Sequence, residues 1–137
     1  MDDLYLISIG LILSIFIPQS IKTIEHIIKN KRFSLSSLFV NGGMPSSHSS
    51  FVSALSAAIL ITQKFSILTI VVLAFSLIII RDSFGIRLEV EKQKKIFKKL
   101  YPNETLVDQL RREGHTILQV AIGILFGAIL MSLILFI

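Results

Sequence analysis

Residues 117–137 read ILQVAIGILFGAILMSLILFI, an apolar run without a charged side chain. A helix of about 20 apolar residues spans the hydrocarbon core of a bilayer, so this run is long enough to cross a membrane unaided. The rest of the chain has a similar character, because 53% of the 137 residues are hydrophobic and the mean hydropathy is +0.76. The sequence therefore predicts an integral membrane protein and argues against a water-soluble globule.

Three further apolar stretches, residues 4–17, 51–61 and 66–80, precede this run, and each is shorter than a bilayer crossing. The first can continue as a helix through Pro18 to about Ile28, because polar side chains recur there at helical spacing. The second can be extended at both ends by short polar residues. We therefore expect an all-α membrane bundle of about four transmembrane helices that forms a single domain, residues 1–137.

The basic residues are divided unequally between the two sides that four crossings would create. Of the 14 Lys and Arg residues, four lie between residues 22 and 47 and nine between residues 81 and 115, and only Lys64 falls on the opposite side. Because basic loops stay in the cytoplasm, the sequence predicts a multi-pass protein of the cell membrane with both termini outside. The formal charge of +5 then points to anionic lipid as a partner, since no nucleic-acid-reading motif is present.

Residues 86–100 combine one apolar face with many lysines. Ile86, Val90, Phe97 and Leu100 fall near one side of a helix, which predicts an amphipathic helix at the cytoplasmic interface that ends near Pro102. A solvated, lysine-rich connector is the alternative interpretation. The residues alone do not distinguish the two.

Small residues recur at the spacing that lets helices approach closely in lipid. One row contains Ser49, Ser53 and Ala57, another contains Ser50, Ala54 and Ala58, and Gly123 and Gly127 form a third. The pattern leaves open whether these rows join helices within one chain or between two. Four helices enclose little volume, which favours a homodimer.

The loop Gly42 to Ser49 reads GGMPSSHS and leads into an apolar run. Glycines allow the backbone to approach a ligand, and Pro45 suits the first turn of a helix. Free amides of that turn and the hydroxyls of Ser46 and Ser47 would converge on an anion, with His48 as a proton donor near neutral pH. The alternative is a serine-capped helix whose histidine lies at a membrane interface.

Several ionisable residues lie near the predicted span ends on the cytoplasmic side, where such groups usually line a functional cavity or pair with each other. They are Lys22, His48, Asp82, Arg87 and His115. A phosphate ester would satisfy this set, because the two cations neutralise its oxygens and two histidines can flank the phosphorus. Lys22 could instead extend to the interface, and Asp82 could pair with Arg81. The chain has no cysteine, so thiolate chemistry is excluded, and we expect no metal or cofactor.

Four motifs in order resemble the divergent branch of the type 2 phosphatidic-acid phosphatase superfamily, which is related to acid phosphatases and vanadium haloperoxidases. The motifs are Gln19-x-x-Lys22, the loop Gly42 to Ser49, Asp-x-x-Gly-x-Arg at 82–87, and Gly-His-x-x-x-x-Val at 114–120. The resemblance implies that His115 attacks phosphorus and that His48 protonates the leaving group. It also implies that Lys22, Ser46, Ser47 and Arg87 bind phosphate.

The chain departs from the wider superfamily near the nucleophile. An aspartate follows the nucleophilic histidine after four residues in the superfamily, where this chain has Gln119, and an arginine six residues earlier is replaced by Gln109. An attacking histidine needs a group that fixes its tautomer, and Asp82 is our candidate for that role. Arg87 can replace the missing arginine.

These observations predict a metal-independent lipid phosphatase that faces the cytoplasm and acts on a phospholipid such as phosphatidate or phosphatidylglycerophosphate. A second class is a transferase of the CDP-alcohol phosphatidyltransferase kind, because Asp82-x-x-Gly85-x-Arg87 faintly resembles its acidic signature. The further aspartates that would hold divalent metal are missing, with only Glu89 and Glu91 nearby. A non-catalytic membrane protein that binds anions or acidic lipids is the third.

Overall fold

The computed structural model describes residues 3–31, 43–101 and 114–136, and every structural statement below refers to these residues. They form the helices α1 (Asp3–Asn30), α2 (Ser47–Gln63), α3 (Ile67–Phe84), α4 (Ile86–Leu100) and α6 (Ile117–Leu135). The predicted all-α class is confirmed. Gly42, Pro102 and Gln109, which entered the sequence argument, lie outside the described residues.

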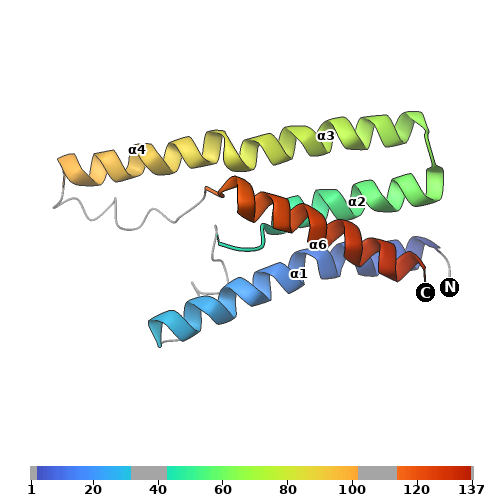
Figure 1. Ribbon diagram of the computed structural model, residues 1–137, viewed down its shortest axis with the longest axis horizontal. Helices are drawn as coiled ribbons and strands as arrows, with labels where there is room; N and C mark the ends of the chain where they lie inside the picture. Colours follow the sequence, from blue (N-terminus) through green and yellow to red (C-terminus); the bar gives the residue numbers. More distant parts are fainter. Residues whose placement is uncertain (1–2, 32–42, 102–113, 137) are drawn as a thin grey trace.

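Four of the helices form an antiparallel bundle. Figure 1 shows α1, α2, α3 and α6 alternating in direction, with both chain ends at the same end of the bundle as the α2–α3 turn. Three helical segments are long and apolar enough to cross a membrane: Asp3–Lys29, Ile67–Leu100 and Ile117–Leu135. Helix α2 has 17 residues, fewer than an unaided crossing needs. A membrane protein is thus supported, and the number of four crossings stays a prediction.

Helix α1 continues through Pro18, as the polar stripe predicted. Helix α2 begins at Ser47, within the polar residues by which the sequence allowed it to be extended. Ser46 is its N-cap, so Pro45 precedes the helix and does not lie in its first turn, where the sequence placed it. The Ser46 hydroxyl accepts the backbone N–H of Ser49, which satisfies one of the amides that a helix start leaves without a partner. The alternative of a serine-capped helix therefore describes the role of Ser46.

Helix α2 is the centre of the bundle and packs against α1, α3 and α6. Serine hydroxyls on α2 join it to each of these neighbours. Ser50 donates to the backbone carbonyl of Ser14 on α1 at 2.8 Å, and Ser53 donates to that of Ile124 on α6 at 2.7 Å. Ser56 shares a hydrogen bond of 2.9 Å with Ser76 on α3. Such bonds contribute about 0.6 kcal/mol each within a membrane protein, so α2 is held by several weak, directional contacts.

The two glycines of α6 lie against the start of α2. A Cβ atom at Gly123 would lie 2.6 Å from the carbonyl oxygen of Ser46, and one at Gly127 would lie 1.9 Å from that of Ser50. These glycines therefore serve packing within one chain, which answers a question that the spacing left open. The homodimer stays a prediction.

Helix α4 forms where the amphipathic pattern predicted a helix. Among the described helices it packs only on α3, whose direction it continues beyond the bundle (Figure 1). Its apolar residues Ile86, Phe97 and Leu100 are exposed. The placement of α4 at a membrane interface stays a prediction.

Candidate functional site

The predicted site residues come from five segments that meet at one end of the bundle. Lys22 lies on α1, His48 on the first turn of α2, Asp82 on α3, Arg87 on α4 and His115 just before α6. Charges on Lys22, His48 and Arg87 all act on the ring of His115, which places these side chains around one region. This end is opposite the chain termini in Figure 1.

Lys22 points into the protein. Its side chain is part of a residue that is only 5% exposed, and its Nζ donates a hydrogen bond of 2.7 Å to the Oγ of Ser47. Ser47 in turn donates to the Oε1 of Gln19 at 3.4 Å. Lys22 therefore does not extend to the membrane interface, which was the alternative interpretation of its position. An ammonium group has three N–H donors, so Lys22 can hold the first turn of α2 and still bind an anion there.

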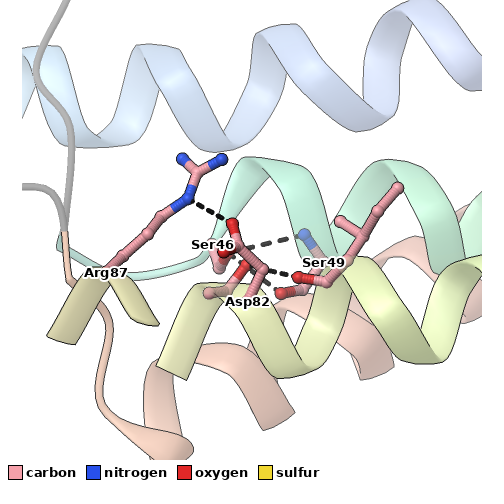
Figure 2. A network of polar contacts seen from close by, with 6 residues as sticks. Ser46, Ser49, Asp82 and Arg87 are labelled. Carbon is pink, nitrogen blue, oxygen red and sulfur yellow. Dashed lines mark hydrogen bonds and ion pairs between the residues drawn. The ribbon is translucent and has the colours of Figure 1, made fainter. Parts of the chain in front are cut away.

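Ser46 supports the loop from beneath. Its oxygen accepts hydrogen bonds from the backbone N–H and the hydroxyl of Ser49, at 3.4 and 3.0 Å (Figure 2). Its own backbone N–H donates to the carbonyl of Gln119 on α6 at 3.3 Å. Ser46 has no exposed surface, and these contacts fix its position between α2 and α6. The expected contacts of Ser46 and Ser47 with phosphate stay predictions.

Asp82 and Arg87 form an ion pair across the α3–α4 junction. The Nε of Arg87 lies 2.7 Å from the Oδ2 of Asp82, as Figure 2 shows. Asp82 therefore pairs with Arg87 and not with Arg81, which was the alternative weighed from the sequence. Because Nε makes this contact, the two terminal amino groups of the guanidinium remain available to bind an oxyanion. We expected Asp82 to orient His115, and no hydrogen bond joins the two side chains among the described residues.

His115 is the most unusual polar residue of this region. It is 4% exposed, and neither of its buried ring nitrogens has a hydrogen-bond partner in the described part of the chain. A buried polar atom without a partner costs about 1–3 kcal/mol, so such atoms are rare and usually have a function. Within the described residues, both ring nitrogens of His115 therefore lack a partner, which makes this side chain a candidate for contact with a ligand.

The backbone around His115 is fixed by three successive N–H groups, each with a different acceptor. Gly114 donates to the Oε2 of Glu91 at 3.2 Å, and His115 donates to the carbonyl of Ser83 at 3.2 Å. Thr116 donates to the Oε1 of Gln119 at 2.9 Å and completes the capping box of α6. The histidine is therefore attached to α3, α4 and α6 at once, which makes its position well defined.

Burial lowers the pKa of His115 from 6.5 to about 4, and the positive charges of Lys22, His48 and Arg87 act in the same direction. The carboxylate of Glu91 opposes them. At neutral pH the ring is consequently uncharged, which is the form that has a lone pair for attack or for binding.

This lowered pKa gives a testable pH dependence. Between about pH 4 and pH 6.5 the unfolded chain binds a proton that the folded chain does not, so the free energy of unfolding should fall as the pH drops through this range. We expect an NMR titration of the histidine rings in detergent to show one ring that titrates near pH 4. That signal should be missing from His115→Gln, and a pKa of 6.5 or above for His115 would contradict the burial argument.

His48 differs from His115 in its surroundings. His48 is exposed in the first turn of α2, within the stretch 42–49 that the sequence marked as an anion site. An exposed imidazole can exchange protons with water and can meet a ligand that arrives from outside. The two residues therefore differ in exposure, and the different roles expected for their rings stay predictions.

Glu91 and Ser83 were missed as site residues. From the sequence, Glu91 was expected only as a possible metal ligand. Its spacing from Arg87 could have indicated it, because residues four apart lie on one face of a helix. Ser83 contributes only its backbone carbonyl, for which the sequence holds no signal.

Comparison with known proteins supports the resemblance noted above. The family model described as "Divergent PAP2 family" matches residues 5–130 of the chain. No curated protein and no solved structure matches the chain.

Proposed function

Because the chain belongs to the divergent PAP2 family, we propose that it is a metal-independent lipid phosphatase. Its substrate is a phosphomonoester of the phosphatidate or phosphatidylglycerophosphate type. One observation carries the proposal: among the residues that the structure describes, the two nitrogens of the buried His115 ring have no hydrogen-bond partner, and the charges of Lys22 and Arg87 act on this ring. A phosphoryl group would supply both the missing partner and the negative charge.

Binding of the phosphoryl group falls to the cations and to the first turn of α2. Lys22 and the terminal amino groups of Arg87 neutralise its oxygens. The hydroxyls of Ser46 and Ser47 turn toward it as donors, which for Ser47 replaces the 3.4 Å contact with Gln19. The positive end of the α2 dipole adds to this attraction. These donors surround the phosphoryl group and stabilise the charge that builds up on its oxygens during transfer.

The reaction then proceeds in two displacements. A lone pair of the neutral His115 ring attacks phosphorus, so that an N–P bond forms while the P–O bond to the lipid alcohol breaks. His48, which the negative charge of the bound phosphoryl group holds protonated, gives its proton to the leaving oxygen. In the second step His48 takes a proton from water, the water oxygen bonds to phosphorus, and the N–P bond breaks. Inorganic phosphate leaves, and both histidines return to their starting state.

The orientation follows from charge. The end of the bundle that carries Lys22, Arg87 and the lysines of α4 faces the cytoplasm by the positive-inside rule, so the substrate comes from the inner leaflet of the cell membrane. Inside-out vesicles should therefore release phosphate from added lipid, whereas sealed right-side-out vesicles should not. The opposite pattern would reverse the orientation.

The proposal is tested by incubating the purified protein with phosphatidate and with phosphatidylglycerophosphate in detergent micelles that contain EDTA. We expect inorganic phosphate to be released at an undiminished rate with the chelator present, because His115 and the bound cations need no metal. Tight binding of phosphate or vanadate without turnover on either lipid would overturn the phosphatase and favour the anion-binding alternative. An absolute requirement for magnesium would favour the transferase alternative.

A further inference from the structure

Glu91 is a buried acidic residue that the proposed reaction does not use. It lies on α4, one turn after Arg87, and is 8% exposed although most of α4 is open to solvent. A buried carboxylate is costly unless it is paired or bonded. Such a residue on an otherwise exposed helix calls for a specific reason.

The contacts of Glu91 join α4 to the segment that carries His115. One carboxylate oxygen, Oε2, accepts the backbone N–H of Gly114 at 3.2 Å. The other, Oε1, lies 3.2 Å from the Nζ of Lys95, which is itself 67% exposed. Helix α4 packs on no described helix except α3, so the bond to Gly114 is a contact that holds α4 against the start of α6.

The other candidates for supporting His115 are engaged elsewhere. Asp82 binds the Nε of Arg87, and the side chain of Gln119 belongs to the capping box of α6. In the described part of the chain, Glu91 is the one negative charge found to act on the His115 ring. It does so from beside the ring's own backbone and not through a hydrogen bond to the ring nitrogens.

We propose that Glu91 is the positioning residue of His115: its carboxylate fixes the Gly114 backbone and stabilises the positive charge that the imidazole gains when its nitrogen bonds to phosphorus. Only the second of these roles, the stabilisation of positive charge on the imidazole, rests on the proposed function. As the N–P bond forms, the ring donates its lone pair and becomes cationic, and a fixed negative charge nearby lowers the energy of that state. Removing the charge should therefore slow the chemical step more than it weakens binding.

The test compares Glu91→Gln with Glu89→Gln. The amide of Glu91→Gln keeps an oxygen that can accept the Gly114 N–H, so the variant removes charge and little else. Glu89 lies on the same helix, is exposed, and pairs only with Lys92 among the contacts found, which makes Glu89→Gln a matched control for one lost negative charge. We expect Glu91→Gln to lower kcat by about tenfold or more with little change in KM, and Glu89→Gln to change neither.

An NMR titration of the His115 ring supplies a readout that does not depend on turnover. The loss of the Glu91 charge should move the pKa of His115 further down from about 4, so that at pH 4 the ring signal of Glu91→Gln stays at its neutral position. Lys22, His48 and Arg87 also face this ring and are unchanged in both variants. Lys95 is exposed and pairs with Glu91, so Lys95→Gln removes a positive charge beside that carboxylate. This variant should move the pKa of His115 upward.

The outcomes separate this inference from the proposed function. A wild-type protein without phosphatase activity, in which Glu91→Gln still shifts the His115 titration, would overturn the reaction and keep the positioning role. An active protein in which Glu91→Gln matches Glu89→Gln in kcat and in titration would overturn the role of Glu91. If Glu91→Gln lowers both kcat and the unfolding temperature while the titration of His115 stays unchanged, Glu91 is only a structural contact.

Discussion

His115→Ala is expected to lose phosphate release by at least about a thousandfold, because the substitution removes the atom that forms the bond to phosphorus. The loss of one ring should not displace the five segments that form the site, so Lys22 and Arg87 should remain in place. The variant should therefore still bind an oxyanion such as vanadate, although turnover is lost. That combination distinguishes a missing nucleophile from a collapsed site.

The measurement is the initial rate of phosphate release from phosphatidate or phosphatidylglycerophosphate in EDTA-containing micelles, together with vanadate binding to the same preparations. His26→Ala is the control, because His26 lies on α1 and is not among the groups whose charge acts on the His115 ring. It removes the same ring and should retain wild-type activity. Unchanged turnover in His115→Ala would refute the assignment of the nucleophile, even if the protein proved to be a phosphatase.

Gly127→Ala is expected to destabilise the bundle by about 1–3 kcal/mol, through overpacking at the interface between α2 and α6. The added Cβ would lie 1.9 Å from the carbonyl oxygen of Ser50, which belongs to the backbone and cannot rotate away. The two helices must therefore move apart. This movement would also loosen the hydrogen bond from Ser53 to the carbonyl of Ile124, which joins the same two helices.

Gly10→Ala provides the matched control for this packing prediction. A Cβ at Gly10 would meet the Cε of Met131 at 2.7 Å, but that atom is the end of a flexible side chain that can change rotamer. Unfolding followed by helical circular dichroism in detergent should give a lower midpoint for Gly127→Ala than for Gly10→Ala. Equal midpoints for the two variants would show that the α2–α6 approach is less tight than the structure describes.

Much of the fold follows from local properties of the sequence. The apolar run that begins at residue 117, the polar stripe that carries α1 past Pro18 and the amphipathic pattern of α4 each predict a helix with nearly correct bounds. Hydropathy and helical spacing depend on neighbours within a few residues, so they can be interpreted without knowledge of the fold. The place of Pro45 was wrong, because Ser46 takes the cap position of α2 and leaves the proline outside the first turn.

The site was only partly predictable, because its contacts join residues that lie far apart in the sequence. The motifs singled out Lys22, His48, Arg87 and His115, whose side chains the structure brings to one region. They did not reveal that Asp82 pairs with Arg87, that Ser46 is buried and bonded to Ser49, or that Glu91 accepts the backbone N–H of Gly114. Those contacts depend on how the helices pack, and several polar residues of suitable chemistry were available for each role.

By itself the sequence determined the all-helical class and the apolar helices of a membrane protein, and its motifs marked two histidines and several cations as candidate site residues. Only the tertiary structure decided which of these groups are buried and which partner each one takes. The physical reason is distance along the chain. Lys22 reaches Ser47 across 25 residues and Glu91 reaches Gly114 across 23, and contacts of this kind exist only after the helices have packed against one another.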